Sequence, residues 1–180
     1  MRVEEFKLID KTFNESMFLS KVNNVFIKFF TAIMLEELED IRHFVSEDVY
    51  KYAEDIVKRM QNNGWRQMYD ELNVKNSEIV SIEVNESVYK IKVFLQSRYL
   101  DYIMNLSNDS LVSGNNWDRV QKNWMLTFSR KVEVDTQGVV RKCPGCGAPM
   151  NVNYSGKCLY CGAIYNQSDY DWVLTKLENS

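Results

Sequence analysis

The sequence predicts an α+β fold: two N-terminal helices packed on a curved antiparallel sheet, with a small zinc ribbon at the C-terminal end. Three observations support this. Apolar residues recur with a period near 3.6 early in the chain and with a period of two through its middle. All four cysteines then lie within residues 143–161. We expect an α+β domain over residues 1–137 and the ribbon with a docking tail over residues 138–180.

The first long helix is predicted over residues 14–40, because its apolar side chains form one stripe wide enough to face a sheet. The stripe consists of Phe18, Val22, Val25, Phe26, Phe29, Phe30, Ile33, Met34 and Leu38. Four carboxylates at its end are expected on a solvated face: Glu36, Glu37, Glu39 and Asp40. A second helix is expected to start after Ser46, a good N-cap, and to stop at Gly64, a good left-handed residue.

Alternation of apolar and polar residues begins at Ile79 and marks the predicted strands. It is clearest over residues 88–95, continues over 97–106, and returns in the extended stretch 117–134. Long consecutive strands joined by short turns predict an antiparallel sheet with the helices on one face. A strand run as long as 88–106 cannot stay flat, so we expect a bend or bulge that curves the sheet.

The cysteines form two Cys-x-x-Cys pairs with eleven residues between them. They are Cys143, Cys146, Cys158 and Cys161. Two such turns can complete a tetrahedron of thiolates around one zinc ion. Gly147 and Gly162 each follow a pair and allow backbone N–H groups to face the sulfurs. We predict one structural zinc ion per chain, because four thiolates leave no open position for a substrate.

Two disulfides or a thioredoxin-like redox site are the alternatives to zinc. Disulfides need an oxidising compartment, and the sequence shows no signal peptide. A redox site would use only one pair, beside a βαβ pattern. No apolar run approaches the ~20 residues that span a bilayer, so we expect a cytoplasmic protein whose membrane association, if any, depends on a partner. The net charge of −3 argues against a nucleic-acid partner.

The tail over residues 169–174 is aromatic and apolar, and it is expected to pack the ribbon against the body of the protein. Tyr170 and Trp172 are the predicted anchors. Both strand and helix are compatible with this segment.

Residues 143–174 read CPGCGAP, then SGKCLYCG, then DYDWVL, and this run resembles the C-terminal ribbon of bacterial proteins with a Tim44-like domain. Upstream, Asp101-Tyr102 and residues 124–130 look like the sheet motifs of that family, and residues 38–50 are similar to its helix-to-helix corner. The resemblance implies a cone-shaped, nuclear transport factor two-like α+β fold with a cavity between the helices and the curved sheet.

The excess of large apolar side chains predicts that the concavity between the first helix and the sheet binds an apolar ligand, such as a lipid tail, or a partner protein segment. The expected lining residues are Phe26, Phe29, Phe30, Phe94, Tyr99, Trp124 and Phe128. A fully packed core is the competing interpretation. The oligomeric state is not indicated by the sequence.

No catalytic residue is predicted. The only histidine, His43, stands alone at the corner between the helices. Alternation places Tyr99 and Asp101 on one face of their strand and Arg98 and Tyr102 on the other, so no acid–base group is evident. A non-catalytic binding or adaptor domain is therefore the favoured function. An enzyme that uses the cavity and a nucleic-acid-binding zinc ribbon are the alternatives.

Overall fold

The structure is a computed structural model that describes residues 1–132, 146–148, 160–161 and 172–180. Its helices are α1 (Val3–Ile9), α2 (Glu15–Leu35), the short 3-10 helix η1 (Leu38–Ile41) and α3 (Glu47–Asn62). Its strands are β1 (Trp65–Val84), β2 (Val88–Asn105), β3 (Leu111–Gly114), β4 (Val120–Lys131) and β5 (Val173–Asn179).

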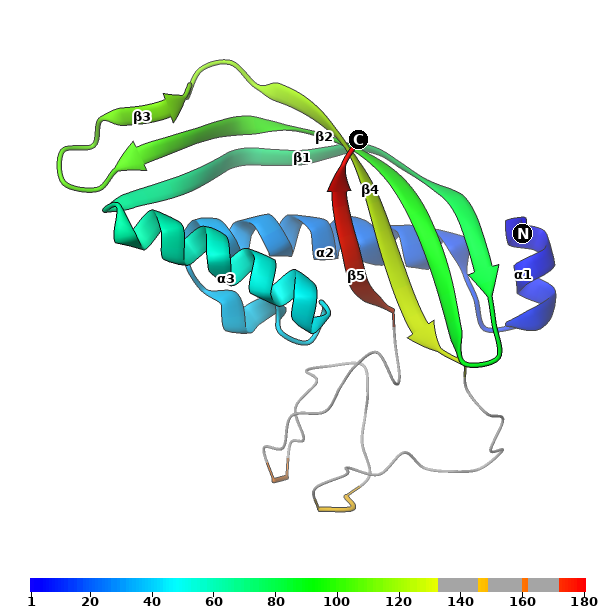
Figure 1. Cartoon of the computed structure of the whole chain (residues 1–180). Coiled ribbons are helices and arrows are strands. Elements are labelled where there is room, and N and C mark those ends of the chain that lie inside the picture. The colour runs from blue at the N-terminus through cyan, green and yellow to red at the C-terminus, as the bar shows by residue number, and fades with distance from the viewer. Residues whose placement is uncertain (133–145, 149–159, 162–171) are drawn as a thin grey trace.

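The strands form one curved antiparallel sheet in the order β1-β2-β4-β5, with β3 beside the far end of β2. The sheet arches over α2 and α3, which lie together on its concave side, and α1 sits at one end (Figure 1). The predicted α+β class, with helices on one face of a curved antiparallel sheet, is confirmed.

Helix α2 carries the predicted apolar stripe against the sheet. Its buried residues are Phe18, Val22, Val25, Phe26, Phe29, Phe30, Ala32 and Ile33. By length and composition alone α2 could also cross a membrane, but here its apolar side is part of the core. The expectation that no segment reaches this limit was too strict, because α2 is long and apolar enough despite the two lysines that interrupt its apolar residues.

The predicted end of the first helix, at residue 40, is wrong. Helix α2 ends at Leu35, and Glu36 takes a left-handed conformation with φ of 60°. The backbone N–H of Glu37 then closes the helix by donating to the carbonyl oxygen of Ala32 at 2.9 Å. Carboxylates interact unfavourably with the negative end of a helix dipole, so the acidic run ends the helix instead of extending it.

Strand β1 begins at Trp65, fourteen residues before the predicted start of alternation at Ile79. Most of its side chains are exposed or half-buried, which weakens the sequence signal. The pairing with β2 shifts register at Asp70/Asn73, Val74/Asn76 and Ile79/Ser81, each time with an extra residue on β1. The bulges that curve the sheet are therefore on β1, and the predicted bend in β2 is supplied by its partner.

Strand β5 returns the chain to the sheet beside β4, with Val173 opposite Ser129. The preceding Trp172 is buried, with its ring centroid 5.1 Å from that of Phe18 and 4.9 Å from the Arg130 guanidinium. The tail is thus a strand from residue 173 onward, and Trp172 anchors it as predicted. The other predicted anchor, Tyr170, lies outside the described residues.

A buried ion pair holds α1 and its connection to the same end of the sheet. Arg130 on β4 binds Asp10, and the Asp10 side chain also accepts a hydrogen bond from the Thr12 hydroxyl. Burial disfavours the charged form of Asp10, but the hydrogen bonds from Thr12 and Arg130 outweigh it and lower the pKa of the carboxyl. Nearby, Phe6 of α1 is fully buried against Phe13 and Tyr89.

Candidate functional site

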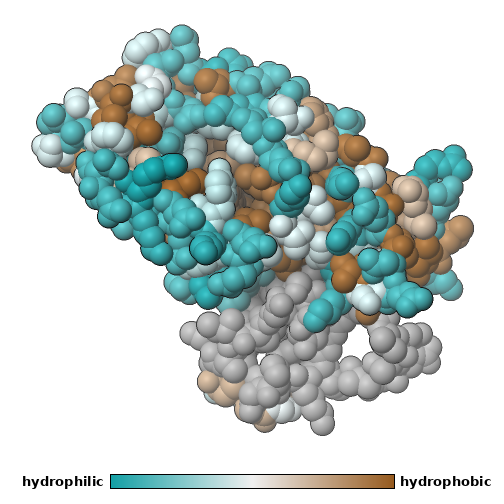
Figure 2. Space-filling model, in the orientation of Figure 1, coloured by the Kyte–Doolittle hydropathy of each residue, from teal (hydrophilic) through white to brown (hydrophobic). Residues whose placement is uncertain are grey.

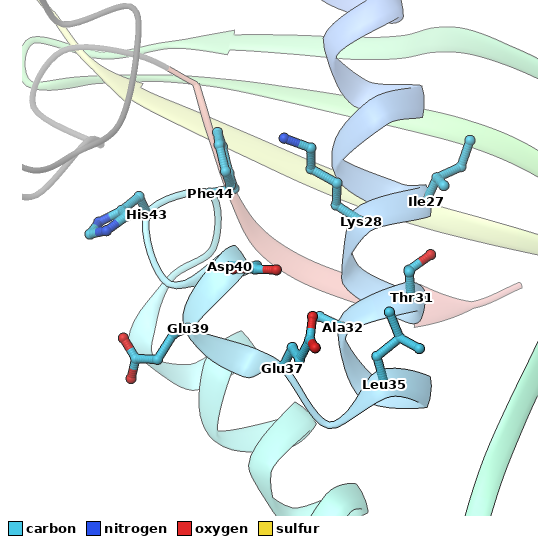
Figure 3. Close-up of a pocket in the computed structure, with 10 residues that line it drawn as sticks. All are labelled: Ile27, Lys28, Thr31, Ala32, Leu35, Glu37, Glu39, Asp40, His43 and Phe44. Atoms are coloured by element: carbon cyan, nitrogen blue, oxygen red, sulfur yellow. The ribbon is translucent and has the colours of Figure 1, made fainter.

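A pocket of about 550 Å³ opens at the corner where α2 gives way to η1. We call it the corner pocket. It is lined by Ile27, Lys28, Thr31, Ala32, Leu35, Glu37, Glu39, Asp40, His43 and Phe44 (Figure 3). One wall is the side of α2 that faces away from the sheet, and the other is the chain from η1 to the start of α3.

The second wall of the corner pocket is fixed by contacts with the C-terminal strand. The backbone N–H of Leu174 donates to the carbonyl oxygen of Phe44 at 3.0 Å, and that of Ser46 donates to the carbonyl oxygen of Leu174 at 2.9 Å. The Ser46 side chain also caps α3 by accepting from the N–H of Val49, as predicted. Below the wall, Ile41 is fully buried. The position of Phe44 therefore depends on β5.

A second pocket of about 510 Å³ continues along α2 toward its N-terminal end. Its lining is Ser16, Met17, Ser20, Lys21, Asn24, Val25, Lys28 and Phe44. Lys28 and Phe44 belong to both pockets, and the Lys28 ammonium lies 4.7 Å from the centre of the Phe44 ring. This cation–π contact marks the boundary between two adjoining hollows on one face of α2.

Carboxylates dominate the charge of the corner pocket. With His43 neutral, one lysine against three acidic residues gives a formal charge of −2. Figure 3 shows the Glu37 and Asp40 carboxylates turned toward α2, whereas Glu39 and His43 point away. The Tyr50 hydroxyl donates to Glu39 at 3.4 Å. The pocket therefore combines an apolar floor with two carboxylates on its rim.

The structure does not place the seven predicted ligand-binding residues around either pocket. Phe26, Phe29, Phe30, Tyr99, Trp124 and Phe128 are buried, and Phe94 is half-buried. The ring centroids of Phe30 and Trp124 are 5.1 Å apart, and those of Phe30 and Phe29 are 5.3 Å apart. Phe128 instead contacts Phe18 at 5.8 Å. An apolar ligand site among these rings stays a prediction.

Phe94 differs from the other six because of strand alternation. Its neighbours Val93 and Leu95 are fully buried in the core below the sheet. Successive side chains of a strand point to opposite faces, so Phe94 lies on the face turned away from α2. The aromatic side chain of Phe94 suggested that it lines the cavity, but its position in the strand alternation places it on the opposite face of the sheet.

Polar groups gather on the concave face at the far end of β2. Asp101 accepts from the Gln67 side chain at 2.9 Å and from Lys122 Nζ at 2.6 Å. Two tyrosines lie beside it, with the ring centroids of Tyr69 and Tyr99 5.9 Å apart. Burial, and then the negative charge of Asp101, raises the pKa of both phenols. Both carboxylate oxygens of Asp101 are thus engaged, and the phenols stay protonated at neutral pH.

The predicted separation of this strand's polar residues is confirmed. Tyr102, one residue along from Asp101, faces the other side of the sheet, where its hydroxyl donates to Asp70. This hydrogen bond is the main cause that raises the pKa of Tyr102 to about 12. The structure therefore does not bring Tyr102 and Asp101 together.

The four predicted zinc ligands fall only partly within the described residues. Cys146 and Cys161 are described and exposed. Cys143 and Cys158 lie outside the described residues. The ligand set of the ribbon therefore stays a prediction.

The corner pocket was missed by sequence reasoning, although two signals pointed toward it. The acidic run at residues 36–40 was interpreted as a solvated face, and His43 was placed correctly at the corner between the helices. The remaining lining residues, such as Lys28 and Thr31, lie on the side of α2 that the apolar stripe leaves exposed or half-buried. Polar and apolar residues alternate irregularly on that side, so they give no periodic signal of a binding surface.

One curved sheet, helices on its concave face and pockets on the outer side of α2 define a small α+β domain consistent with the nuclear transport factor two-like fold. Residues 1–138 match the Tim44-like domain, and the chain belongs to that family. Among solved structures, the intermembrane space region of the chloroplast protein ARC6 is similar, with 9% identity and a TM-score of 0.45. That alignment covers 89% of this chain and 94% of the other. No curated protein sequence matches the chain significantly.

Proposed function

We propose that this Tim44-like domain is a non-catalytic binding domain that holds a segment of a partner protein in the corner pocket. The single observation that carries the proposal is the composition of that pocket: an apolar floor on the outer side of α2, with carboxylates on the rim. Apolar side chains of a partner would supply affinity, and the polar rim would fix their orientation. The volume of about 550 Å³ is that of a typical ligand pocket and suits a few side chains.

The polar group at Asp101 is satisfied within the protein. Each oxygen of the Asp101 carboxylate accepts one hydrogen bond, from Gln67 and from Lys122. An enzyme that uses the concave face is the alternative. A nucleic-acid partner is disfavoured, because the pocket and the whole chain are acidic.

The proposal retains a structural zinc ion on Cys143, Cys146, Cys158 and Cys161. It rests on the spacing of the two Cys-x-x-Cys pairs, which fits tetrahedral thiolate coordination. Zinc would stabilise the ribbon and take no part in chemistry. A cytoplasmic location and a domain boundary at residues 137/138 stay predictions alongside it.

Photo-crosslinking tests the proposed binding site. Benzoylphenylalanine is introduced at Thr31, on the wall of the pocket, and in a control chain at Asn76, which is exposed on β1. We expect irradiation of cells that make the full chain to attach one discrete protein at position 31 and none at position 76. Adducts with lipid alone would favour the lipid alternative, and equal adducts at both positions would contradict the proposal.

The captured protein then allows a quantitative test. Thr31→Trp fills the pocket and should weaken binding at least tenfold, whereas Asn76→Trp should not change it. The far-UV circular dichroism of both variants should match the wild type, because neither position is in the core. Unchanged affinity of the folded Thr31→Trp variant would place the binding site elsewhere.

A further inference from the structure

Strand β3 has a free edge. It pairs with β2 on one side, and among the strands that the structure describes none pairs with its other side. Strand β5 does not reach β3. It pairs with β4 from Ser129 to Trp124, and the last hydrogen bond is from the N–H of Ser180 to the carbonyl oxygen of Asn123. In Figure 1, β3 lies at the end of the arch far from β5. Backbone groups along this edge are available to another strand.

Large apolar side chains surround this edge. Their exposed fractions are 48% for Leu106, 41% for Leu111, 37% for Val112 and 67% for Trp117. Figure 2 shows apolar atoms gathered at the end of the molecule where β3 lies. The Asn115 side chain orders the turn that carries Trp117 by accepting from its backbone N–H at 3.3 Å. The ring is therefore displayed on a defined turn.

The two edges of the sheet differ in how they are protected. Soluble proteins guard edge strands with charges, prolines and bulges. Strand β1, at the opposite edge, has three register shifts and the exposed charged residues Lys75 and Glu78. The β3 sequence Leu-Val-Ser-Gly has no charge and no proline, and its protection consists of its length of four residues and one register shift at Val112. The β3 edge therefore lacks the charged side chains that protect the β1 edge.

We propose that the β3 edge pairs with the β3 edge of a second copy of the chain, antiparallel across a twofold axis. Identical edges are self-complementary under such an axis, and the pairing would continue an already antiparallel sheet. The apolar side chains that flank each edge would then cover one another. The pairing lies at the end of the arch, whereas the corner pocket is built from α2 and η1, so the proposal does not depend on the binding function above.

The area sets the expected strength of this dimer. With ~250 Å² for a whole tryptophan, Trp117 alone exposes on the order of 150 Å². The four side chains together present roughly 350 Å², which is the size of the functional patches found on monomers. A stable interface takes about 800 Å² per partner. The dimer should therefore be weak and reversible.

Sedimentation equilibrium of the full, zinc-loaded chain under reducing conditions tests the proposal. We expect the average mass to rise from 21.2 kDa toward twice that value as the concentration increases from about 5 to about 500 μM. Val112→Lys should raise Kd at least tenfold. Val80→Lys changes an exposed valine on the β1 edge, 54% exposed, and should leave Kd unchanged.

Hydrogen exchange identifies the surface involved. Amides of residues 111–114 should gain protection as the concentration rises, and those near Val80 should not. A chain that is monomeric throughout the range overturns the proposal. So does a dimer that Val112→Lys leaves intact, which would assign the contact to another surface.

Discussion

Removal of the Trp172 side chain should destabilise the domain strongly, although the residue precedes the last strand. The side chain is 4% exposed and is packed against the rings of Phe6, Phe13 and Phe18. Truncation to alanine removes roughly 200 Å² of buried area, worth ~5 kcal/mol at ~25 cal/mol per Å². Loss of the cation–π contact with Arg130 adds about 1 kcal/mol. Relaxation around the cavity offsets part of this, so we expect Trp172→Ala to cost ~4 kcal/mol.

Urea unfolding followed by far-UV circular dichroism measures this cost, because that signal does not depend on tryptophan fluorescence. Trp117→Ala is the matched control. Its side chain is 67% exposed, so the variant should lie within ~0.5 kcal/mol of the wild type at concentrations where the chain is monomeric. A loss below ~1 kcal/mol for Trp172→Ala, with an unchanged denaturant dependence, would show that the tail is not part of the folding unit.

Three further perturbations test separate features. Cys158→Ser should lower zinc content from one equivalent, measured by elemental analysis, while the helix and sheet signal persists, because the α+β core has its own apolar faces. Asp10 has a lowered pKa in the folded protein. Its stabilising effect is therefore complete above the unfolded pKa of ~3.9 and is lost as pH falls through the folded pKa. The unfolding free energy of the wild type should exceed that of Asp10→Asn at neutral pH, and this difference should shrink only below pH ~4. Gly114→Ala should cost about 3 kcal/mol in thermal unfolding, because φ is +72° and the new Cβ would lie 2.2 Å from the Asp101 carbonyl oxygen. Gly64→Ala is the control: φ is +67° but the space is open, so it should cost about 1 kcal/mol.

Elements with one strongly apolar face were predictable from the sequence. Helix α2, and strand β2 from Tyr89 to Tyr99, each carry a regular period of buried side chains, and both were predicted with the right class and face. Strand β1 was recognised only from Ile79, because most of its residues are half-buried or exposed and the bulges break the alternation. Helix α1 was not predicted, since seven residues with the single buried side chain Phe6 give no usable period.

The candidate site was less predictable than the fold, for a physical reason. The wall of the corner pocket is held by two backbone hydrogen bonds to Leu174, which donates to Phe44 and accepts from Ser46, about 130 residues earlier in the chain. No local pattern encodes a contact of that separation. The predicted lining residues meet a different difficulty. Six of the seven aromatic side chains lie in the interior, but the sequence does not show whether such rings surround a void or fill it. Here Phe30 contacts both Phe29 and Trp124.

Helix α2 serves the core with one side and the pockets with the other, and this division makes stability and binding separable. Its buried side, exemplified by Phe26 and Phe30, fixes the position of the helix under the sheet. Its outer side supplies Lys28 and Thr31 to the pocket walls, where they carry little packing energy. Substitutions on the outer side should therefore change binding with little change in unfolding free energy. Core substitutions should reduce both together, because the pocket exists only while α2 stays in place. A partner that binds unchanged to variants of the outer side, and is lost only through core substitutions that unfold the domain, would show that it recognises a surface other than the outer side of α2.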